Sequence, residues 1–351
     1  MTLFDLGYDA ELEKYRETHD LMAYDVGRII SEQKERYVVR SADSEYDAEV
    51  IGNIRYTSTD RTDFPAAGDW VAFKKYEEGK ALIYALFPRK TIIERSAVGK
   101  PGRKQIIATN IDDAFIVQSV DRDFNMNRME RYLTICYSSG IDPAIILSKT
   151  DLISDLKLSE LIHMVQTRIR NVPIIAVSNE TGTGYEELTR LIRKGKTYCV
   201  LGSSGVGKST IINNLAGARM MKTGEISESR NKGRHTTSHR QLVVLEHGGI
   251  LIDNPGMREV GITDSDTGVK TTFDKITVLS AGCKYKDCTH TDETGCAVIK
   301  AVENGGLDRA SYENYLRLER EKAHFASTLE ERRKKEKEFG KMTKQFKRLN
   351  R

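Results

Sequence analysis

The sequence predicts a multi-domain protein with an N-terminal β-barrel, a central α/β unit with a mostly parallel sheet, and a mainly helical C-terminal region. Three observations support this fold class. Short β-type runs fill residues 22–88, apolar strands alternate with helical segments from residue 114 to 253, and cysteines cluster after residue 280. A chain of 351 residues also exceeds the usual size of one compact core.

The N-terminal part contains a polar segment, residues 1–21, that predicts a short helical extension. Five β-type runs follow it, separated by polar turns, at residues 23–30, 36–40, 49–56, 69–76 and 81–87. Five short strands in so small a space favour a closed barrel over residues 22–90, with the OB-fold as the leading candidate.

Barrels of this kind often bind nucleic acid through exposed aromatic and basic side chains. The sequence therefore predicts an RNA-binding barrel, although for any single aromatic residue a place in the barrel core is the better interpretation. The aromatic residues available are Tyr37, Tyr56, Trp70, Phe73 and Tyr76.

The central unit, residues 91–265, begins after a basic stretch at 89–105 that we interpret as a linker because it contains Pro101 and two glycines. Alternating strands and helices then predict a parallel sheet covered on both faces. Strands are expected at 114–120, 144–147, 173–177, 198–201, 241–246 and 249–253, and helices at 127–139, 157–171, 185–193 and 210–216.

Residues 202–209 read G-S-S-G-V-G-K-S, a phosphate-binding loop between an apolar run and a helical run. Glycines allow backbone N–H groups to face phosphate oxygens, and the helix N-terminus adds positive potential. Lys208 is expected to reach the β- and γ-phosphates, and the Ser209 hydroxyl to bind Mg²⁺. The predicted nucleotide contacts are Gly202, Ser203, Ser204, Gly205, Val206, Gly207, Lys208, Ser209 and Thr210.

Ahead of this loop, Ser148-Lys149-Thr150-Asp151 follows a predicted strand and is similar to the N-K-x-D element that reads guanine. An ionised Asp151 only accepts hydrogen bonds, so it suits the N1–H and amino donors of guanine and rejects adenine. Lys149 is expected to pack along the base. Because Ser148 stands where asparagine is more frequent, its contact with the base edge and the phosphate loop is predicted to be weaker or water-mediated.

A second base-reading element is predicted at Val177-Ser178-Asn179-Glu180-Thr181-Gly182, where a backbone N–H would meet guanine O6. Asn179 replaces a smaller residue, which a main-chain contact tolerates. Both elements follow parallel strands, and ligands collect at the carboxyl edge of such sheets.

Downstream, Asp253-Asn254-Pro255-Gly256 matches D-x-x-G, with Asp253 expected to hold Mg²⁺ and the Gly256 N–H to sense the γ-phosphate. Between the phosphate loop and this turn lies G-R-H-T-T, whose Thr236 or Thr237 would ligate Mg²⁺; the predicted Mg²⁺ ligands are Ser209, Thr237 and Asp253. Base readers thus precede the phosphate loop, which predicts a circularly permuted nucleotide site.

Met257 occupies the position where many GTPases have a glutamine that orients the attacking water. Slow intrinsic hydrolysis is therefore expected. His235 either positions the water or orders its own loop, and both interpretations remain open. The predicted catalytic set is His235, Lys208, Thr236 and Thr237.

The C-terminal region, residues 266–351, contains C-x₄-C-x-H-x₅-C, formed by Cys283, Cys288, His290 and Cys296. Thiolates and imidazole at this spacing suit one tetrahedral, structural Zn²⁺. The other two cysteines, Cys136 and Cys199, lie in apolar patterns and are expected in the core.

The chain has a net charge of +4, but residues 329–351 alone hold ten Lys/Arg and four Glu. This basic tail is either a solvated helix end or an RNA contact. No signal peptide or membrane-spanning run is recognised, so the sequence predicts a cytoplasmic protein with reduced thiols and no membrane partner.

Together, G-R-H-T-T, the permuted order, Gly68-Asp69-Trp70-Val71, the segment 103–112 and the cysteine spacing resemble the circularly permuted ribosome small-subunit-dependent GTPases (RsgA/YjeQ type) over about residues 22–320. We expect a monomer. The resemblance implies a protein that binds the 30S subunit and its 16S rRNA late in maturation. It implies hydrolysis of GTP to GDP that the subunit stimulates and that drives release. Ser148 and Asn254 depart from the family pattern.

Two alternatives belong to other classes. A phosphate-loop kinase would need an acceptor site and would have no use for base readers, and comparing GTP with ATP binding separates it. A nucleic-acid-binding module with a vestigial nucleotide site is opposed by the intact Lys208, Ser209 and Asp253.

Overall fold

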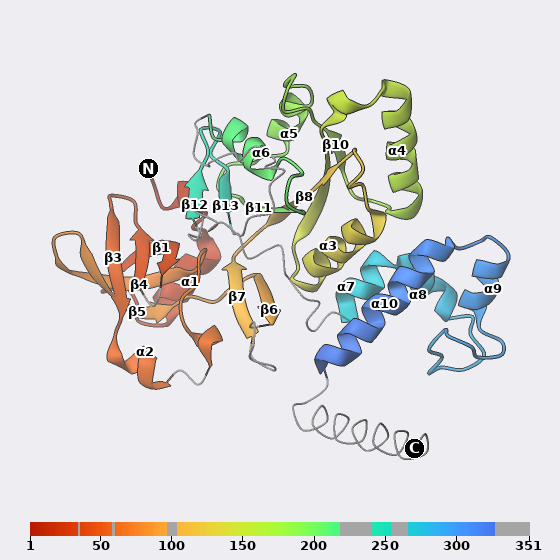
Figure 1. The fold of residues 1–351 in the computed structure, drawn as a ribbon. Coiled ribbons are helices and arrows are strands. Elements are labelled where there is room, and N and C mark those ends of the chain that lie inside the picture. The colour runs from red at the N-terminus through yellow and green to blue at the C-terminus, as the bar shows by residue number, and fades with distance from the viewer. Residues whose placement is uncertain (34–35, 58–59, 97–103, 218–240, 254–265, 327–351) are drawn as a thin grey trace, which may run out of the picture.

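The computed structural model describes residues 1–33, 36–57, 60–96, 104–217, 241–253 and 266–326. Its parts follow one another along the chain: a barrel, a six-stranded sheet flanked by helices, and a group of C-terminal helices (Figure 1). The basic tail at 329–351 lies outside the described residues. No helix in the described part is long and apolar enough to cross a bilayer.

The barrel closes in the order β1-β2-β3-β5-β4, with β3 and β5 parallel, and this closed five-stranded arrangement is that of an OB-fold. Its strands are β1 (Asp25–Gln33), β2 (Arg36–Arg40), β3 (Glu45–Val50), β4 (Trp70–Glu77) and β5 (Lys80–Leu86), and α2 (Gly52–Thr57) and η2 (Arg61–Asp63) connect β3 to β4.

The third strand differs from its prediction at 49–56. The strand occupies Glu45–Val50, and a helix follows at Gly52–Thr57. Along β3, Tyr46, Ala48 and Val50 are buried while the acidic residues between them are exposed. This strict alternation fixes the register on the barrel interior, and the prediction missed it because half of the strand is acidic.

Three of the five aromatic candidates for RNA stacking are core residues. Tyr37 and Trp70 are 2% exposed and Phe73 is fully buried, so none presents a ring face to a ligand. Tyr56 and Tyr76 are 94% and 53% exposed. Only these two of the five remain available for stacking.

The N-terminal extension, with η1 (Phe4–Leu6) and α1 (Ala10–Thr18), packs on the barrel. The Tyr8 ring meets Trp70 edge-on at 5.0 Å between centroids. Arg28 of β1 is buried and donates to the carbonyl oxygens of Leu6 (2.7 Å), Gly68 (3.1 Å) and Asn110 (3.0 Å). Burial lowers the pKa of Arg28 to about 10, so the guanidinium stays charged and joins the extension, the barrel and the central unit.

The stretch 89–105, interpreted as a linker, instead contains β6 (Ile92–Ser96) and the start of β7 (Lys104–Thr109), and these two strands pair antiparallel as a hairpin. Ile93 and Ile107 are fully buried in the central core, and this tertiary burial outweighs the basic composition of the segment. Arg89 reaches back to the buried Asp69 at 2.8 and 2.7 Å, and Thr109 donates to the same carboxylate at 2.6 Å. The Arg89–Asp69 ion pair therefore joins the segment before β6 to the barrel, and the Thr109 hydrogen bond joins β7 to the same carboxylate.

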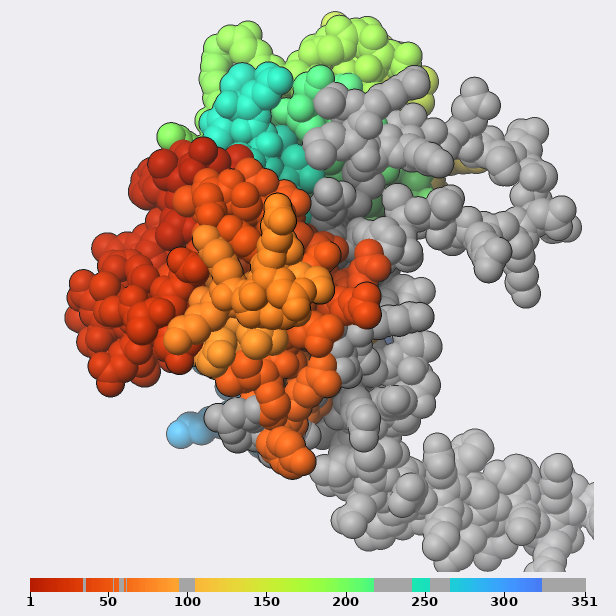
Figure 2. Space-filling model, turned by 90° about the vertical axis from the view of Figure 1, so that its left-hand side faces the viewer, coloured from red at the N-terminus to blue at the C-terminus, as the bar shows by residue number. Residues whose placement is uncertain are grey.

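The central sheet has the order β10-β9-β8-β11-β13-β12, with all neighbours parallel except β12, which pairs antiparallel with β13. The strands are β8 (Asp113–Ser119), β9 (Asp142–Ser148), β10 (Ile174–Ala176), β11 (Thr197–Leu201), β12 (Gln241–Val244) and β13 (Ile250–Asp253). The helices are α3 (Met126–Ser138), η3 (Thr150–Leu152), α4 (Asp155–Arg168), α5 (Tyr185–Arg190) and α6 (Lys208–Leu215). The barrel lies against the β12–β13 edge (Figure 2).

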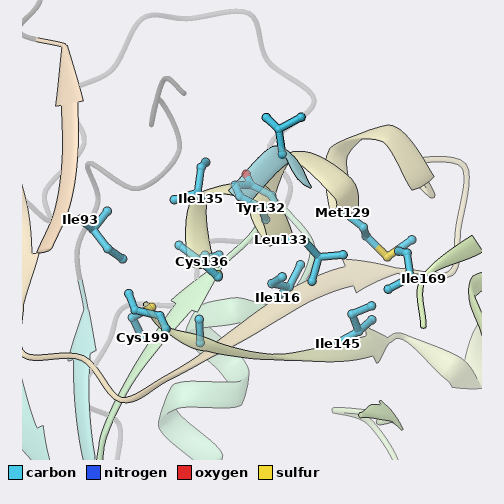
Figure 3. Packing of buried hydrophobic residues seen from close by; sticks show 14 of the residues in the cluster. Ile93, Ile116, Met129, Tyr132, Leu133, Ile135, Cys136, Ile145, Ile169 and Cys199 are labelled. Carbon is cyan, nitrogen blue, oxygen red and sulfur yellow. The ribbon is translucent and has the colours of Figure 1, made fainter. Parts of the chain in front are cut away.

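Alternate residues of each strand face different helices, which confirms a sheet covered on both sides. Ile116 and Ile145 pack with Leu133 of α3, whereas Val117 and Ile146 belong to the cluster that contains α5 and α6 (Figure 3). Cys136 and Cys199 lie within the first cluster as predicted. Burial raises the pKa of both thiols, so they remain protonated core residues.

The C-terminal region is helical, with α7 (Asp266–Thr272), α8 (Asp274–Ser280), α9 (Ala297–Glu303) and α10 (Arg309–Ala326). It docks on α3, where the backbones of α7 and α3 approach so closely that a Cβ on Gly268 would lie 2.2 Å from the Thr134 carbonyl oxygen. Arg131 of α3 forms a double hydrogen bond with Glu321 of α10, each of 2.6 Å. The metal-ligand cluster lies between α8 and α9.

Candidate nucleotide site and metal centre

The predicted nucleotide elements meet at one edge of the sheet. β8, β9, β10, β11 and β13 run parallel, so the residues that follow them come together at their carboxyl ends. The base-reading segments follow β9 and β10, the phosphate loop follows β11, and Asp253 ends β13. Along the chain the phosphate loop comes third among these four elements, after both base-reading segments, which is the permuted order.

The phosphate loop is a compact turn between β11 and α6. Gly202 has φ 148° and packs so tightly that a Cβ there would lie 2.4 Å from the Val117 carbonyl oxygen. Gly207, at φ 92°, precedes the first turn of α6. The Lys208 ammonium donates to the carbonyl oxygens of Gly202 (2.9 Å) and Ser203, so its charge lies against the loop backbone. This geometry leaves the cation close to where the loop N–H groups would hold phosphate.

Ser148 contacts the phosphate loop directly. Its hydroxyl is buried and donates to the Val206 carbonyl oxygen at 2.6 Å. The predicted water-mediated contact with the loop is therefore wrong, because the short serine side chain reaches the backbone of the fully buried Val206 directly. Whether the contact is weaker than that of an asparagine stays a prediction, as does the contact of Ser148 with the base edge.

The two base-reading segments are linked to each other. The Ser178 hydroxyl donates to Asp151 Oδ1 at 2.6 Å and accepts from the N–H groups of Glu180 (3.2 Å) and Thr181 (3.1 Å). Ser178 is buried, whereas Asp151 is exposed. One carboxylate oxygen is thus held by a fixed donor while the side chain remains accessible to a ligand.

Lys149 is held by a carboxylate that the sequence analysis missed. Its ammonium lies 2.9 Å from Asp121 Oδ2, and Asp121 also accepts from the Ser119 hydroxyl and the Asp123 N–H. Burial alone would raise the pKa of Asp121, but these donors outweigh it and lower the pKa. The signal was its position just beyond β8, at the same edge as the other elements.

Asn179 uses its side chain within the protein. Its Oδ1 accepts from the Tyr185 hydroxyl at 2.6 Å, and that hydroxyl accepts from Asn214 of α6 at 2.8 Å. Its Nδ2 packs against Gly207, where a Cβ would lie only 2.6 Å from that nitrogen. The side chain is occupied, which suits a ligand contact made by the backbone.

The structure places two further predicted site residues, and four others lie outside the described residues. Thr210 lies in the first turn of α6, and Thr150 begins η3, where its N–H donates to the Val177 carbonyl oxygen. Four predicted residues lie outside the described residues, and their roles stay predictions: His235, Thr236, Thr237 and Gly256.

The four predicted metal ligands converge. The ligand atoms of Cys283, Cys288, His290 and Cys296 all lie within 4.8 Å of one another. Cys283 Sγ is 3.6 Å from His290 Nδ1 and 3.9 Å from Cys296 Sγ, and Cys296 Sγ is 3.4 Å from His290 Nδ1. Tetrahedral Zn²⁺, with bonds of about 2.3 Å to sulfur and about 2.0 Å to nitrogen, would place two sulfurs about 3.8 Å apart and a sulfur and a nitrogen about 3.5 Å apart.

The donor set therefore fits a closed tetrahedral site that could hold a metal ion. His290 adopts φ 61°, and its carbonyl oxygen accepts from the Tyr312 hydroxyl of α10 at 2.6 Å. The Ile299 N–H donates to Cys296 Sγ at 3.5 Å. These contacts orient the ligand residues and connect the cluster to α9 and α10.

Comparisons with known proteins agree with this geometry. The sequence model of the RsgA GTPase family matches residues 86–263. The chain is 43% identical over 299 residues to "Small ribosomal subunit biogenesis GTPase RsgA 2" of Lactiplantibacillus plantarum, covering 85% of this chain and 84% of that protein. It is 39% identical over 322 residues to RsgA 1 of Bacteroides thetaiotaomicron, covering 92% of this chain and 90% of the relative.

Solved structures extend the likeness to the fold. The crystal structure of YjeQ from Thermotoga maritima is 25% identical, with a TM-score of 0.63 over 84% of this chain and 96% of that one. YloQ, "a circularly permuted GTPase", has the same fold, with a TM-score of 0.63 over 88% of this chain and 99% of that one, at 24% identity. With the family match, the relatives and the permuted site in agreement, the chain belongs to the RsgA family of GTPases.

Proposed function

We propose that this protein binds the small ribosomal subunit through its 16S rRNA and couples GTP hydrolysis to late maturation of that subunit and to its own release. The observation that carries the proposal is that the Ser178–Asp151 hydrogen bond joins the two base-reading segments to each other and the Ser148–Val206 hydrogen bond joins them to the phosphate loop. A site built this way suits guanine with an attached triphosphate. The relatives are named for small-subunit biogenesis, which supports the partner.

In this proposal each element has one task. Asp151 reads the N1–H and amino group of guanine, and the loop N–H groups with Lys208 hold the phosphates. Ser209, Thr237 and Asp253 would bind Mg²⁺, which supplies charge stabilisation at the phosphates when bound. His235, Thr236 and Thr237 complete the site, and since Met257 cannot orient water, hydrolysis is slow until the subunit supplies or orders the missing group.

The partner is tested by co-sedimentation with purified small subunits under a non-hydrolysable GTP analogue or under GDP. We expect the protein to pellet with the subunits under the analogue and to remain in the supernatant under GDP, because hydrolysis is proposed to drive release. Binding that is equal with both nucleotides would contradict the coupling. No binding in either case would contradict the partner.

We also propose that the Cys₃His cluster holds one structural Zn²⁺, supported by its thiolate-rich, closed donor set. Purified protein is expected to contain one zinc per chain, and chelation is expected to unfold the segment around α8 and α9, because metal binding supplies its folding free energy. Elemental analysis and circular dichroism measure both. Cys288→Ser should lose the metal, whereas Cys136→Ser, at a buried thiol outside the cluster, should retain it. Equal zinc contents in the two variants would refute the assignment.

A further inference from the structure

The first turn of α3 places an arginine against the phosphate loop. Asn125 caps α3 by accepting from the Arg128 N–H at 3.0 Å. The Arg128 side chain then crosses to the loop, where Nη1 donates to Ser203 Oγ at 3.0 Å and, more weakly, to the Asp123 carbonyl oxygen at 3.4 Å. Neither the phosphate-loop pattern nor the base-reading elements include this residue.

The charge of Arg128 is not neutralised by a carboxylate in the part of the chain that the structure covers, since both of its partners there are uncharged oxygens. Neighbouring cations differ in this respect. Lys149 pairs with Asp121 at 2.9 Å, and Arg131 pairs with Glu321 at 2.6 Å. A half-buried guanidinium without a counter-ion, beside a loop shaped for phosphate, adds positive potential where an anion binds.

The helix that carries Arg128 is firmly held. Two residues further on, Glu130 is buried and bonded to Arg168 of α4 and to Asn314 of α10. The α7 backbone packs on the same helix at Gly268. Because α3 is fixed from several sides, Arg128 is directed at Ser203 before any nucleotide arrives, which reduces the entropy lost on binding.

We propose that Arg128 is a positioning and specificity residue of the GTP site. It holds the phosphate loop through Ser203, and its uncompensated charge favours the triphosphate over the diphosphate, since GTP carries more negative charge than GDP. This inference rests on the proposed GTPase site and adds a residue to it. If Arg128 has this role, α3 connects the C-terminal helices, which pack on it, to the nucleotide site.

The test compares Arg128→Gln, which removes the charge and keeps donors, with Arg128→Lys, which keeps the charge. Affinities for a non-hydrolysable GTP analogue and for GDP are measured by calorimetry at low and high salt. We expect Arg128→Gln to bind the analogue about tenfold more weakly, GDP to change much less, and Arg128→Lys to recover most of the loss. The difference in analogue affinity between the wild type and Arg128→Gln should shrink at high salt, because screening weakens the attraction between Arg128 and the phosphates in the wild type.

Arg131→Gln is the matched control: it makes the same substitution three residues along α3, at a side chain that faces Glu321 instead of the loop. It should leave both affinities unchanged.

Ser203→Ala, which removes the contact and keeps the charge, provides a second variant should Arg128→Gln fold poorly. This variant should lower both affinities equally and preserve the preference for the triphosphate. Equal losses for GTP and GDP in Arg128→Gln, or no loss, would overturn the inference. Wild-type protein that binds neither nucleotide would instead overturn the GTPase proposal.

Discussion

Asp151→Asn is expected to weaken GTP binding by about 10²–10⁴-fold and to transfer preference to xanthosine triphosphate. The carboxylate would accept two hydrogen bonds from guanine, each contributing about 1.5–3 kcal/mol because the acceptor is charged. An asparagine amide would instead place a donor opposite the guanine amino group. Xanthine has a carbonyl at that position. This carbonyl would accept a hydrogen bond from the asparagine amide, while the xanthine N1–H would still donate to the asparagine Oδ1.

The side-chain geometry favours this exchange. Ser178 donates to Asp151 Oδ1 at 2.6 Å, and an asparagine Oδ1 can accept the same bond, so the amide nitrogen would face the ligand. Affinities for both triphosphates, measured with labelled nucleotide, give the result. Asp155→Asn, an exposed carboxylate at the start of α4, is the control and should change neither affinity. Retained GTP affinity in Asp151→Asn would show that this residue does not read the base.

Glu130→Ala is expected to lower the free energy of unfolding by up to about 3–5 kcal/mol, because it removes the buried counter-ion of the half-buried Arg168 and leaves that arginine only the exposed Asp308, 3.3 Å away. Glu130 is 1% exposed and receives two hydrogen bonds of 2.6 Å from Arg168. Asn314 and Ser311 of α10 donate to the same carboxylate at 2.5 and 3.1 Å. The substitution therefore affects the packing of α3, α4 and α10 together.

Denaturant unfolding followed by circular dichroism measures this loss. Glu186→Ala removes one partner of the exposed Glu186–Arg190 pair and should cost less than about 1 kcal/mol. Replacing Glu130 and Arg168 together with leucine and methionine should recover part of the stability, since, among the described residues, the only charge then left without its partner is the exposed Asp308. If Glu130→Ala costs no more than Glu186→Ala, the network does not stabilise this interface.

The sequence identified the elements whose chemistry is local. The phosphate loop, the Ser148–Asp151 segment and the Cys/His cluster are short patterns in which spacing itself sets geometry, and the structure brings each set together. The alternation of apolar strands and helices predicted the central sheet for the same reason.

Long-range contacts account for what the sequence did not reveal. Asp121, Arg128 and Glu130 acquire partners from segments between 28 and 184 residues away, and no local pattern marks Arg128 or Glu130. The segment that contains β6 was interpreted as a linker because its composition is basic, and no sequence pattern showed that Ile93 and Ile107 are buried. The direct Ser148–Val206 bond depends on how closely β9 approaches the loop, which backbone packing decides.

In the proposed function, the small ribosomal subunit stimulates hydrolysis at the permuted GTP site. The most direct test is GTP turnover with and without purified small subunits, with large subunits and Lys208→Ala as controls. We expect turnover to rise at least about tenfold with small subunits only, as when a partner completes a GTPase site, and Lys208→Ala to remain inactive. Turnover that is the same with and without small subunits would contradict the claim.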